Sequence, residues 1–294
     1  MLRSLFFVPA NRSDLHAKLL RFRADAYVLD LEDGTPAADK HFARDQLGAC
    51  IGGLRAMGLH GRLLVRVNAP ASEHYLNDVA AVLASDADGL VIPKLEDTEE
   101  LFPVLHGLQR RGTRMTHPRS ILAGIESVRG VQAVERLLAR SPLLDSLYFG
   151  AEDFVADLGG RRTAQGQEVL YARSRVAMAA RERGVSAIDQ AVIAVRDEAL
   201  YRQDAEMGRD LGFRGKICLT PEQIDACHGV FSPSAEEVGR AQRMFQTHEE
   251  AAVRGLGTPL FEGQRMEDGP LLRQARATLD TALATSMAVP HMHP

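Results

Sequence analysis

Two short stretches decide the fold: Leu122-Ala123-Gly124-Ile125-Glu126-Ser127 and Leu147-Tyr148-Phe149-Gly150-Ala151-Glu152-Asp153. In each, an apolar run typical of a buried strand ends in a carboxylate, and the amphipathic segment 128–140 between them has helical periodicity. The pattern predicts a parallel βαβ unit with Glu126 and Asp153 at its carboxyl edge. Carboxylates at the ends of adjacent parallel strands point into one crevice, and such hard oxygen ligands suit Mg²⁺.

The same unit recurs along the whole chain. Strand-like runs lie at residues 5–10, 26–31, 63–67, 90–93, 121–125, 147–150, 187–192 and 216–219, and each but the last precedes a helical stretch. Their landmark residues are Asp30, Arg66, Lys94, Glu126, Asp153, Asp189 and Thr220, spaced 27 to 36 residues apart. This regular spacing predicts an α/β fold of the (β/α)8 TIM barrel type, with the active site at the carboxyl ends of the strands. A doubly wound open sheet is the alternative, but the GxGxxG turn expected after its first strand is missing.

The pattern changes after Gln223. Pro233-Ser234 opens a helix that runs to about Gly255, and Pro270 starts a last helix that runs to about Met287. We therefore expect a barrel catalytic domain over residues 1–228. Residues 229–294 are too few for a second domain, so we expect a C-terminal helical arm or lid that contacts a neighbouring subunit.

Composition excludes several classes of protein. The 294 residues are 45% hydrophobic with a net charge of −4, which gives no basic footprint for nucleic acid. No apolar run approaches the ~20 residues needed to span a bilayer, and the first residues lack the features of a signal peptide, so we expect a cytoplasmic protein. Cys50, Cys218 and Cys227 share no CxxC spacing, so we expect reduced thiols.

Charged residues fall at the carboxyl ends of several predicted strands. Glu32-Asp33, Arg66, Lys94, Glu126 and Asp153 all occupy such positions. A charge at the rim of an apolar strand is costly unless water, a ligand or a partner satisfies it. A barrel would gather these side chains around one mouth.

The chain resembles the citrate lyase β-subunit and malyl-CoA lyase family over its whole length. The similar runs, in order, are Leu5-Phe6-Phe7-Val8-Pro9, Leu29-Asp30-Leu31-Glu32-Asp33, Val65-Arg66-Val67-Asn68, Ile92-Pro93-Lys94, Ile125-Glu126, Phe149-Gly150-Ala151-Glu152-Asp153, Ala187-Ile188-Asp189 and Met266-Glu267-Asp268-Gly269-Pro270. The resemblance implies a Mg²⁺-dependent (β/α)8 enzyme that cleaves or forms the carbon–carbon bond of a β-hydroxyacyl thioester. It also implies a homo-oligomer, a trimer or a dimer of trimers.

The resemblance implies roles for four residues. Glu126 and Asp153 would bind Mg²⁺, with Mn²⁺ as the alternative ion, and the metal would chelate the carboxylate and adjacent oxygen of the substrate. Arg66 would face the charge that develops on the thioester oxygen. Asp268, carried by the arm of a neighbouring subunit, would exchange a proton with the acetyl methyl carbon.

Three further residues at strand ends belong to the predicted site. Lys94, Glu32 and Asp33 would join Arg66 and Glu126 in binding substrate, and Glu32 and Asp33 could instead order the water shell of the metal. Lys94 could equally close a structural ion pair across the barrel mouth.

The coenzyme contacts and some of the roles have plainer alternatives. Arg12 and Lys18 would meet the phosphates of coenzyme A, which enters as part of the substrate, or they could belong to a solvated helix face. Arg66 could simply pair with a carboxylate such as Glu32, and Asp268 could be an exposed loop acid. Glu126 or Asp153 taken alone could be a helix cap or half of a salt bridge.

The acyl group of the substrate stays open at this point. Thr220-Pro221 stands where the family usually has a histidine before the proline, and Ala10 and Ser13 replace the common glycine and proline of the first loop. The leading function is cleavage of a citramalyl-, malyl- or citryl-CoA type thioester to acetyl-CoA and a 2-oxo acid, with an acyl-carrier protein as an alternative thioester carrier. A metal-dependent 2-oxo acid aldolase without coenzyme A and a non-catalytic barrel subunit are the alternatives.

Overall fold

A computed structural model describes residues 1–111, 120–255, 259–265 and 268–286. The chain divides into two compact units, Leu2–His228 and Gly229–Pro294, with Met1 assigned to the second. Each unit is described by itself.

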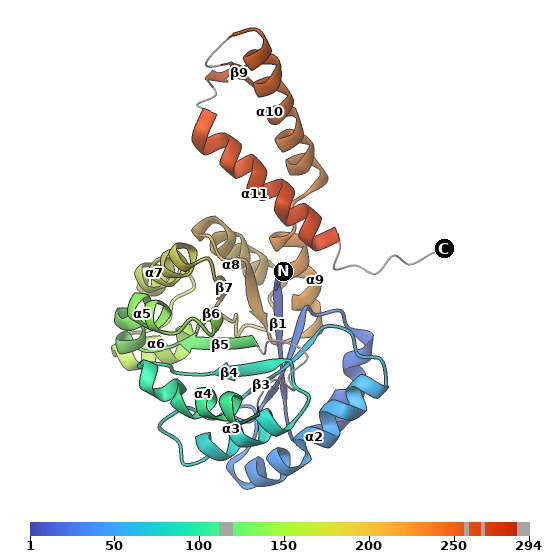
Figure 1. The fold of residues 1–294 in the computed structure, drawn as a ribbon, viewed down its shortest axis with the longest axis vertical. Coiled ribbons are helices and arrows are strands. Elements are labelled where there is room, and N and C mark those ends of the chain that lie inside the picture. Colours follow the sequence, from blue (N-terminus) through green and yellow to red (C-terminus); the bar gives the residue numbers. More distant parts are fainter. Residues whose placement is uncertain (112–119, 256–258, 266–267, 287–294) are drawn as a thin grey trace. The chain divides into compact units, whose positions relative to one another are not determined.

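The larger unit is a closed barrel of eight parallel strands in which each strand pairs with its neighbours along the chain and β1 closes on β8 (Figure 1). The strands are β1 (Ser4–Pro9), β2 (Ala26–Asp30), β3 (Arg62–Arg66), β4 (Gly89–Ile92), β5 (Ser120–Ile125), β6 (Leu144–Phe149), β7 (Ser186–Asp189) and β8 (Gly215–Cys218). This order confirms the predicted TIM barrel. Each strand overlaps its predicted run, although β6 begins earlier, at Leu144, and β7 ends earlier, at Asp189.

Helices surround the strands (Figure 1). They are α1 (Ser13–His16), α2 (Lys40–Ala56), α3 (Tyr75–Ala84), α4 (Phe102–Arg111), α5 (Val128–Arg140), α6 (Ala151–Leu158), α7 (Gln167–Arg183), α8 (Glu198–Leu211) and α9 (Pro221–Phe231). Helix α5 spans the predicted residues 128–140. Helix α2 begins at Lys40, after a 3-10 turn over Ala37–Asp39.

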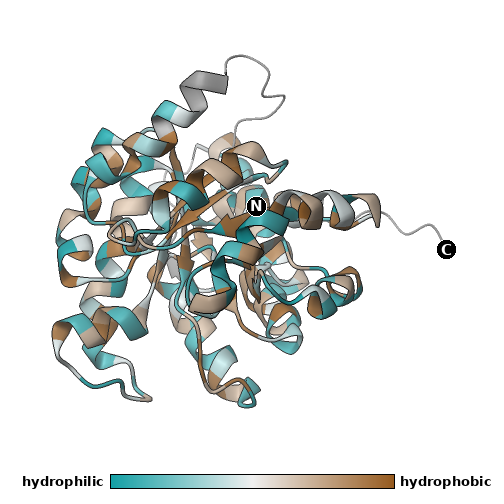
Figure 2. Ribbon diagram, turned by 90° about the horizontal axis from the view of Figure 1, so that it is seen from below, coloured by the Kyte–Doolittle hydropathy of each residue, from teal (hydrophilic) through white to brown (hydrophobic). Residues whose placement is uncertain are grey.

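The barrel interior is filled by alternate residues of the strands, because successive side chains of a strand point to opposite faces. Its buried core consists of Leu2, Leu5, Ala26, Val28, Leu64, Val91, Leu122, Tyr148, Ile188 and Ile217. Figure 2 shows the apolar strands in brown within a ring of helices that carry hydrophilic residues in teal. Closer to the carboxyl ends of the strands, polar residues such as Asp30 and Arg66 join the apolar ones and form part of the mouth.

A buried ion cluster joins β7 and β8 to α7 and α8 outside the barrel. Asp189 on β7 binds Arg173 of α7 at 2.6 Å and the Lys216 ammonium of β8 at 2.8 Å. Asp204 of α8 accepts from the same two cations, at 3.0 Å from Arg173 and 2.5 Å from Lys216. Asp189, one of the landmarks of the predicted repeat, therefore holds helices to the sheet and does not face the mouth.

The smaller unit is a helical hairpin with a short β-ribbon. Helices α10 (Ala235–Val253) and α11 (Asp268–Ser286) flank the antiparallel strands β9 (Leu260–Phe261) and β10 (Gln264–Arg265). Ser234 caps α10 in a capping box with Glu237, which explains the predicted start at Pro233-Ser234. A small core of its own holds the unit together. Within the described ranges of the chain, none of the helices combines the length and the apolarity needed to cross a membrane.

Candidate active site

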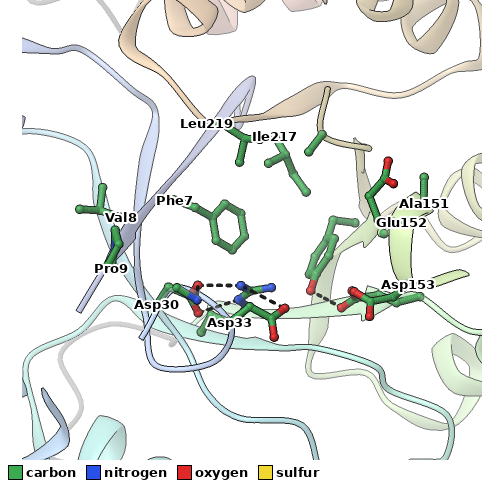
Figure 3. Close-up of a pocket in the computed structure, with 16 residues that line it drawn as sticks. Phe7, Val8, Pro9, Asp30, Asp33, Ala151, Glu152, Asp153, Ile217 and Leu219 are labelled. Atoms are coloured by element: carbon green, nitrogen blue, oxygen red, sulfur yellow. Dashed lines mark hydrogen bonds and ion pairs between the residues drawn. The ribbon is translucent and has the colours of Figure 1, made fainter. Parts of the chain in front are cut away.

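A cavity of about 410 Å³ opens at the carboxyl ends of the barrel strands, and its wall has two chemically different sides (Figure 3). One side carries the carboxylates and the guanidinium of Arg66. The other is apolar, and Figure 3 shows Ile217 and Leu219 lying across the cavity from Asp33 and Asp153. Active sites of TIM-barrel enzymes lie at this face of the fold.

Glu126 is a deeply buried acid of the cavity. It follows β5 directly, is 3% exposed, and its Oε1 accepts hydrogen bonds from the backbone N–H of Lys94 at 3.1 Å and from the hydroxyl of Tyr148. Glycines leave room for it, because a Cβ at Gly150 would lie 2.5 Å from its Oε2 and a Cβ at Gly124 would collide with Oε1. The carboxylate is therefore held from both sides.

Burial and neighbouring negative charges raise the pKa of Glu126 to about 7. Burial is the largest cause, the Tyr148 hydrogen bond opposes it, and the charges of Glu32 and Asp153 add to the rise. When Glu126 is ionised in this setting, the surrounding positive charge does not balance its negative charge. A cation bound beside it would supply the missing charge.

Asp153 lies on a helix and not at a strand end. Strand β6 ends at Phe149, Gly150 is the N-cap residue, and Asp153 stands in the first turn of α6 with its side chain 42% exposed. The prediction was wrong in this local detail, because the helix begins immediately after the strand. An acid in the first turn is stabilised by the positive end of the helix dipole, and Asp153 still faces the cavity.

Lys94 connects the acids. Its Nζ lies 3.0 Å from Glu32 Oε1 and 3.3 Å from Asp153 Oδ1, while its backbone N–H reaches Glu126. Its φ is +51°, a left-handed conformation that is uncommon for a residue with a side chain. Backbone strain of this kind concentrates at functional sites, and here it accompanies the contact with Glu126. The neighbouring carboxylates raise the pKa of Lys94 against the lowering effect of burial.

Arg66 ends β3 and is fully engaged by acids. Its guanidinium binds Asp30 through two hydrogen bonds of 2.7 and 2.6 Å and lies 3.0 Å from Glu32 Oε2. It also stacks over the Phe7 ring, with 5.0 Å between Cζ and the ring centroid. Burial by itself would lower the pKa of Arg66, but the bonds to Asp30 raise it well above its ordinary value. Asp33 is more distant, 3.8 Å from Nη2 and largely exposed.

Asp30 and Glu32, the two acids that pair with Arg66, differ in their other interactions. Asp30 accepts further hydrogen bonds from the backbone N–H groups of Glu32 and Gly34, which fix its orientation. Burial raises the pKa of Glu32 despite the charges of Arg66 and Lys94.

Four of the predicted site residues in the larger unit are not among those that line the cavity, and two of them, Glu32 and Lys94, lie beside it through their ion pairs with Arg66 and Asp153. Arg12 pairs with Asp14 at 2.7 Å on the exposed surface, and Lys18 is exposed in the 3-10 helix Ala17–Arg21. Asp268 is the first residue of α11, in the smaller unit, and its side chain lies outside the described part of the structure.

The structure adds residues that sequence reasoning did not assign to the site. Asp30 was noted only as a landmark, although an acid inside an apolar run was a signal that it has a buried cationic partner. Tyr148 was treated only as part of a strand, yet its hydroxyl donates a hydrogen bond to Glu126. Phe7 and Leu219 line the cavity because the inward-facing positions of β1, and those that follow β8, continue toward the mouth, and the apolar runs themselves do not show which residues face inward.

The donor set fits Mg²⁺. Among the described residues, no group of three or more His, Cys, Asp or Glu side chains is arranged to hold a metal by itself. Mg²⁺ does not require one, because it is commonly bound by one or two carboxylates and completed by substrate and water. Glu126 and Asp153 supply two such carboxylates, and burial, which raises the pKa of Glu126, favours a cation beside its ionised form.

A closed parallel barrel with charged residues gathered at its carboxyl mouth defines the class of (β/α)8 enzymes. The HpcH/HpaI aldolase/citrate lyase family matches residues 3–221, and the chain belongs to that family. This confirms the family expected from the sequence and makes the protein a carbon–carbon lyase.

Relatives and solved structures agree with this assignment. A citrate lyase subunit beta-like protein of Deinococcus radiodurans is 44% identical, covering 95% of this chain and 96% of its own. Human mitochondrial citramalyl-CoA lyase is 33% identical, covering 97% and 86% respectively. The structure of protein CitE from Mycobacterium tuberculosis, in complex with magnesium, acetoacetate and coenzyme A, is 29% identical with a TM-score of 0.77, covering 96% of this chain and 98% of that one.

Proposed function

We propose that the protein is a Mg²⁺-dependent lyase that cleaves a β-hydroxyacyl-CoA thioester to acetyl-CoA and a 2-oxo acid by retro-Claisen chemistry. In this reaction the carbinol hydroxyl loses its proton, its carbon becomes a carbonyl, and the bond to the carbon next to the thioester breaks. The electron pair passes to the thioester as an enolate, which takes up a proton to become the acetyl group.

The pair of carboxylates at Glu126 and Asp153 carries the proposal. A buried acid with a pKa near 7, with glycines packed against it and a second acid in the same side of the cavity wall, is suited to a divalent cation. The relatives support the choice, since one is named a citramalyl-CoA lyase and one solved neighbour contains magnesium and coenzyme A. When bound, the ion would act as a Lewis acid toward the oxygens of the substrate.

Arg66 is the residue we assign to the thioester oxygen. Asp30 locks its guanidinium through two hydrogen bonds, so the charge is fixed before the reaction and need not reorganise as the enolate forms. A fixed cation stabilises developing negative charge more than it stabilises the neutral ground state. Lys94, Glu32 and Asp33 would position Arg66 and the bound substrate from the same side of the cavity, and Arg12 and Lys18 remain our candidates for the coenzyme A phosphates.

Asp268 is the acid that we propose to exchange a proton with the acetyl methyl carbon. It opens α11 of the C-terminal unit, and we propose that this unit is an arm that delivers the acid to the cavity of a neighbouring subunit in a trimer or hexamer. The test is to mix inactive Asp268→Ala and Glu126→Ala chains and let the oligomers reassemble. Recovered activity is expected, and its absence counts against an arm that acts in trans.

The thiols fit the proposed cytoplasmic location, since Cys50, Cys218 and Cys227 are all free.

The proposed function is tested with a panel of thioesters. Purified protein with Mg²⁺ is incubated with citramalyl-CoA, malyl-CoA and citryl-CoA, and release of a 2-oxo acid is followed. Cleavage of at least one of them is expected. No cleavage across the panel, also when the acyl group is carried by an acyl-carrier protein, would refute the proposed function and leave a family aldolase that acts without coenzyme A.

A further inference from the structure

We propose that the 2-oxo acid released by this enzyme has an uncharged side chain, hydrogen or alkyl, and that a carboxymethyl side chain is discriminated against. This inference rests on the proposed function and narrows its substrate. In terms of the thioesters, the malyl and citramalyl types are favoured over the citryl type, because the citryl type carries a third carboxylate into the cavity.

The charges of the cavity wall are strongly one-sided. Among the described residues that line it are five carboxylates, listed here: Asp30, Asp33, Glu126, Glu152 and Asp153. Arg66 is the one cationic side chain among those same lining residues. A wall of this composition attracts a metal ion and repels any anionic group that the metal does not itself neutralise.

The cations in and beside the cavity are already engaged. Arg66 gives two hydrogen bonds to Asp30 and a close ion pair to Glu32. Lys94 at the edge is shared between Glu32 and Asp153 at 3.0 and 3.3 Å. A second substrate carboxylate could recruit either cation only by stripping it from an acid that is already present.

The amino end of α6 offers no spare positive charge either. It faces the cavity at Gly150 and Ala151, and a helix amino terminus can bind an anion. Its first turn already contains Glu152 and Asp153, and the carboxylate of Glu126 lies against Gly150. Three acids therefore meet this helix end before any substrate arrives.

The opposite wall is suited to hydrocarbon. Ala191, Ile217 and Leu219 line it, and the Phe7 ring, which lies between this wall and Arg66, packs edge-on against Tyr148 with centroids 6.3 Å apart. An alkyl group placed there removes apolar surface from water, whereas a carboxylate placed there is desolvated without a partner. The side chain of the 2-oxo acid thus meets either hydrocarbon or acids, and neither surface accepts a carboxylate.

Two measurements test the inference. The first compares kcat/KM for malyl-, citramalyl- and citryl-CoA, and at least about a tenfold disadvantage is expected for citryl-CoA, as for other buried charges without a partner. The second measures the dissociation constants of glyoxylate, pyruvate and oxaloacetate in the presence of Mg²⁺ by calorimetry. The same order is expected, with oxaloacetate the weakest.

A neutral isostere separates charge from size. The compound 4-methyl-2-oxopentanoate has nearly the shape of oxaloacetate with two methyl groups in place of the carboxylate oxygens. It should bind more tightly than oxaloacetate. Equal or weaker binding of the isostere would overturn the electrostatic basis of the inference.

A charge-gain variant provides a second, independent check. Leu219→Lys places an ammonium in the apolar wall, and Leu219→Met is its neutral control of similar length. The lysine variant should shift the binding preference toward oxaloacetate relative to the methionine variant, and no shift counts against the inference.

The outcomes for the inference and for the proposed function remain distinguishable. If citryl-CoA is cleaved as efficiently as the other thioesters, or if oxaloacetate binds as tightly as pyruvate, the inference is overturned while the lyase function stands. If no thioester is cleaved, the proposed function fails, and the binding series with the isostere still decides the inference. Failure of all the 2-oxo acids to bind would overturn both.

Discussion

A single methyl group at Gly150 should disable the proposed metal site without changing any charge. Gly150 has ordinary backbone angles, φ −101° and ψ 93°, so alanine is compatible with the backbone. Its added Cβ would lie 2.5 Å from Glu126 Oε2, 2.6 Å from Cγ and 2.8 Å from Cδ. Because three successive atoms are too close, rotation of the carboxylate does not relieve the contact and the whole side chain must move.

The size of the effect follows from these contacts. Ordinary van der Waals contact begins near 3.4 Å, so Glu126 Oε2 must retreat by about 0.9 Å. A displacement of about 1 Å in a catalytic site can cost roughly 100-fold in rate, and disturbed support of a metal ligand typically costs about 10- to 100-fold in affinity. We expect Gly150→Ala to bind Mg²⁺ at least about tenfold more weakly and to lose about 100-fold in kcat/KM.

Gly160→Ala is the matched control, because its Cβ would find only ordinary contacts, 3.5 Å from Val155 Cγ1 and 3.6 Å from Leu158 Cδ2. Mg²⁺ affinity is measured by calorimetry and activity by release of the 2-oxo acid, with circular dichroism to show that both variants are folded. A loss of ~1–3 kcal/mol in stability is expected for Gly150→Ala from overpacking. Wild-type Mg²⁺ affinity and turnover in this variant would refute the reasoning.

Two further predictions concern stability. Lys216→Met removes one cation from the buried cluster outside the barrel and should cost about 3–5 kcal/mol in the free energy of denaturant unfolding, whereas Arg202→Met breaks only an exposed pair and should cost less than ~1 kcal/mol. Equal losses in the two variants would contradict the importance of the cluster. Burial lowers the pKa of His228, so the unfolded chain binds its proton more readily, and this group subtracts stability as pH falls below about 6.5. Thermal unfolding of His228→Gln should therefore depend less steeply on pH between about 7 and 5 than that of the wild type, and an unchanged slope would be the contrary result.

The barrel was predictable because its signals are local and repeated. Each strand is a short apolar run, each helix has its own periodicity, and the spacing of the polar strand ends gave the number of units. The starts of α5 and α10 were likewise visible, since Ser127 and Ser234 are N-cap residues of the type that favours helix starts.

The pairing of side chains was less predictable, because it depends on which face each residue takes. Asp189 and Glu126 both end apolar runs, but Asp189 points outward to Arg173, whereas Glu126 points into the mouth. The register between neighbouring strands decides this, and a run of four to six apolar residues does not reveal its register. The role of Asp30 as the main partner of Arg66 was hidden for the same reason.

The second feature that the sequence did not predict was the close approach of the backbone to side chains in the barrel mouth. Gly124 and Gly150 read as ordinary small residues in or beside strands, yet they provide the space in which the Glu126 carboxylate lies. The left-handed conformation of Lys94 is similar, since nothing in a Pro-Lys-Leu run indicates it. Both are consequences of the assembled barrel mouth.

The central claim is that Glu126 and Asp153 together hold a divalent cation that the reaction requires. Its most direct test measures Mg²⁺ binding and Mg²⁺-dependent release of a 2-oxo acid in the wild type, Glu126→Gln and Asp153→Asn, which preserve shape and remove charge. The account predicts tight Mg²⁺ binding and activity in the wild type, with both lost in each variant while the fold is retained. Undiminished Mg²⁺-dependent turnover in either variant would contradict it.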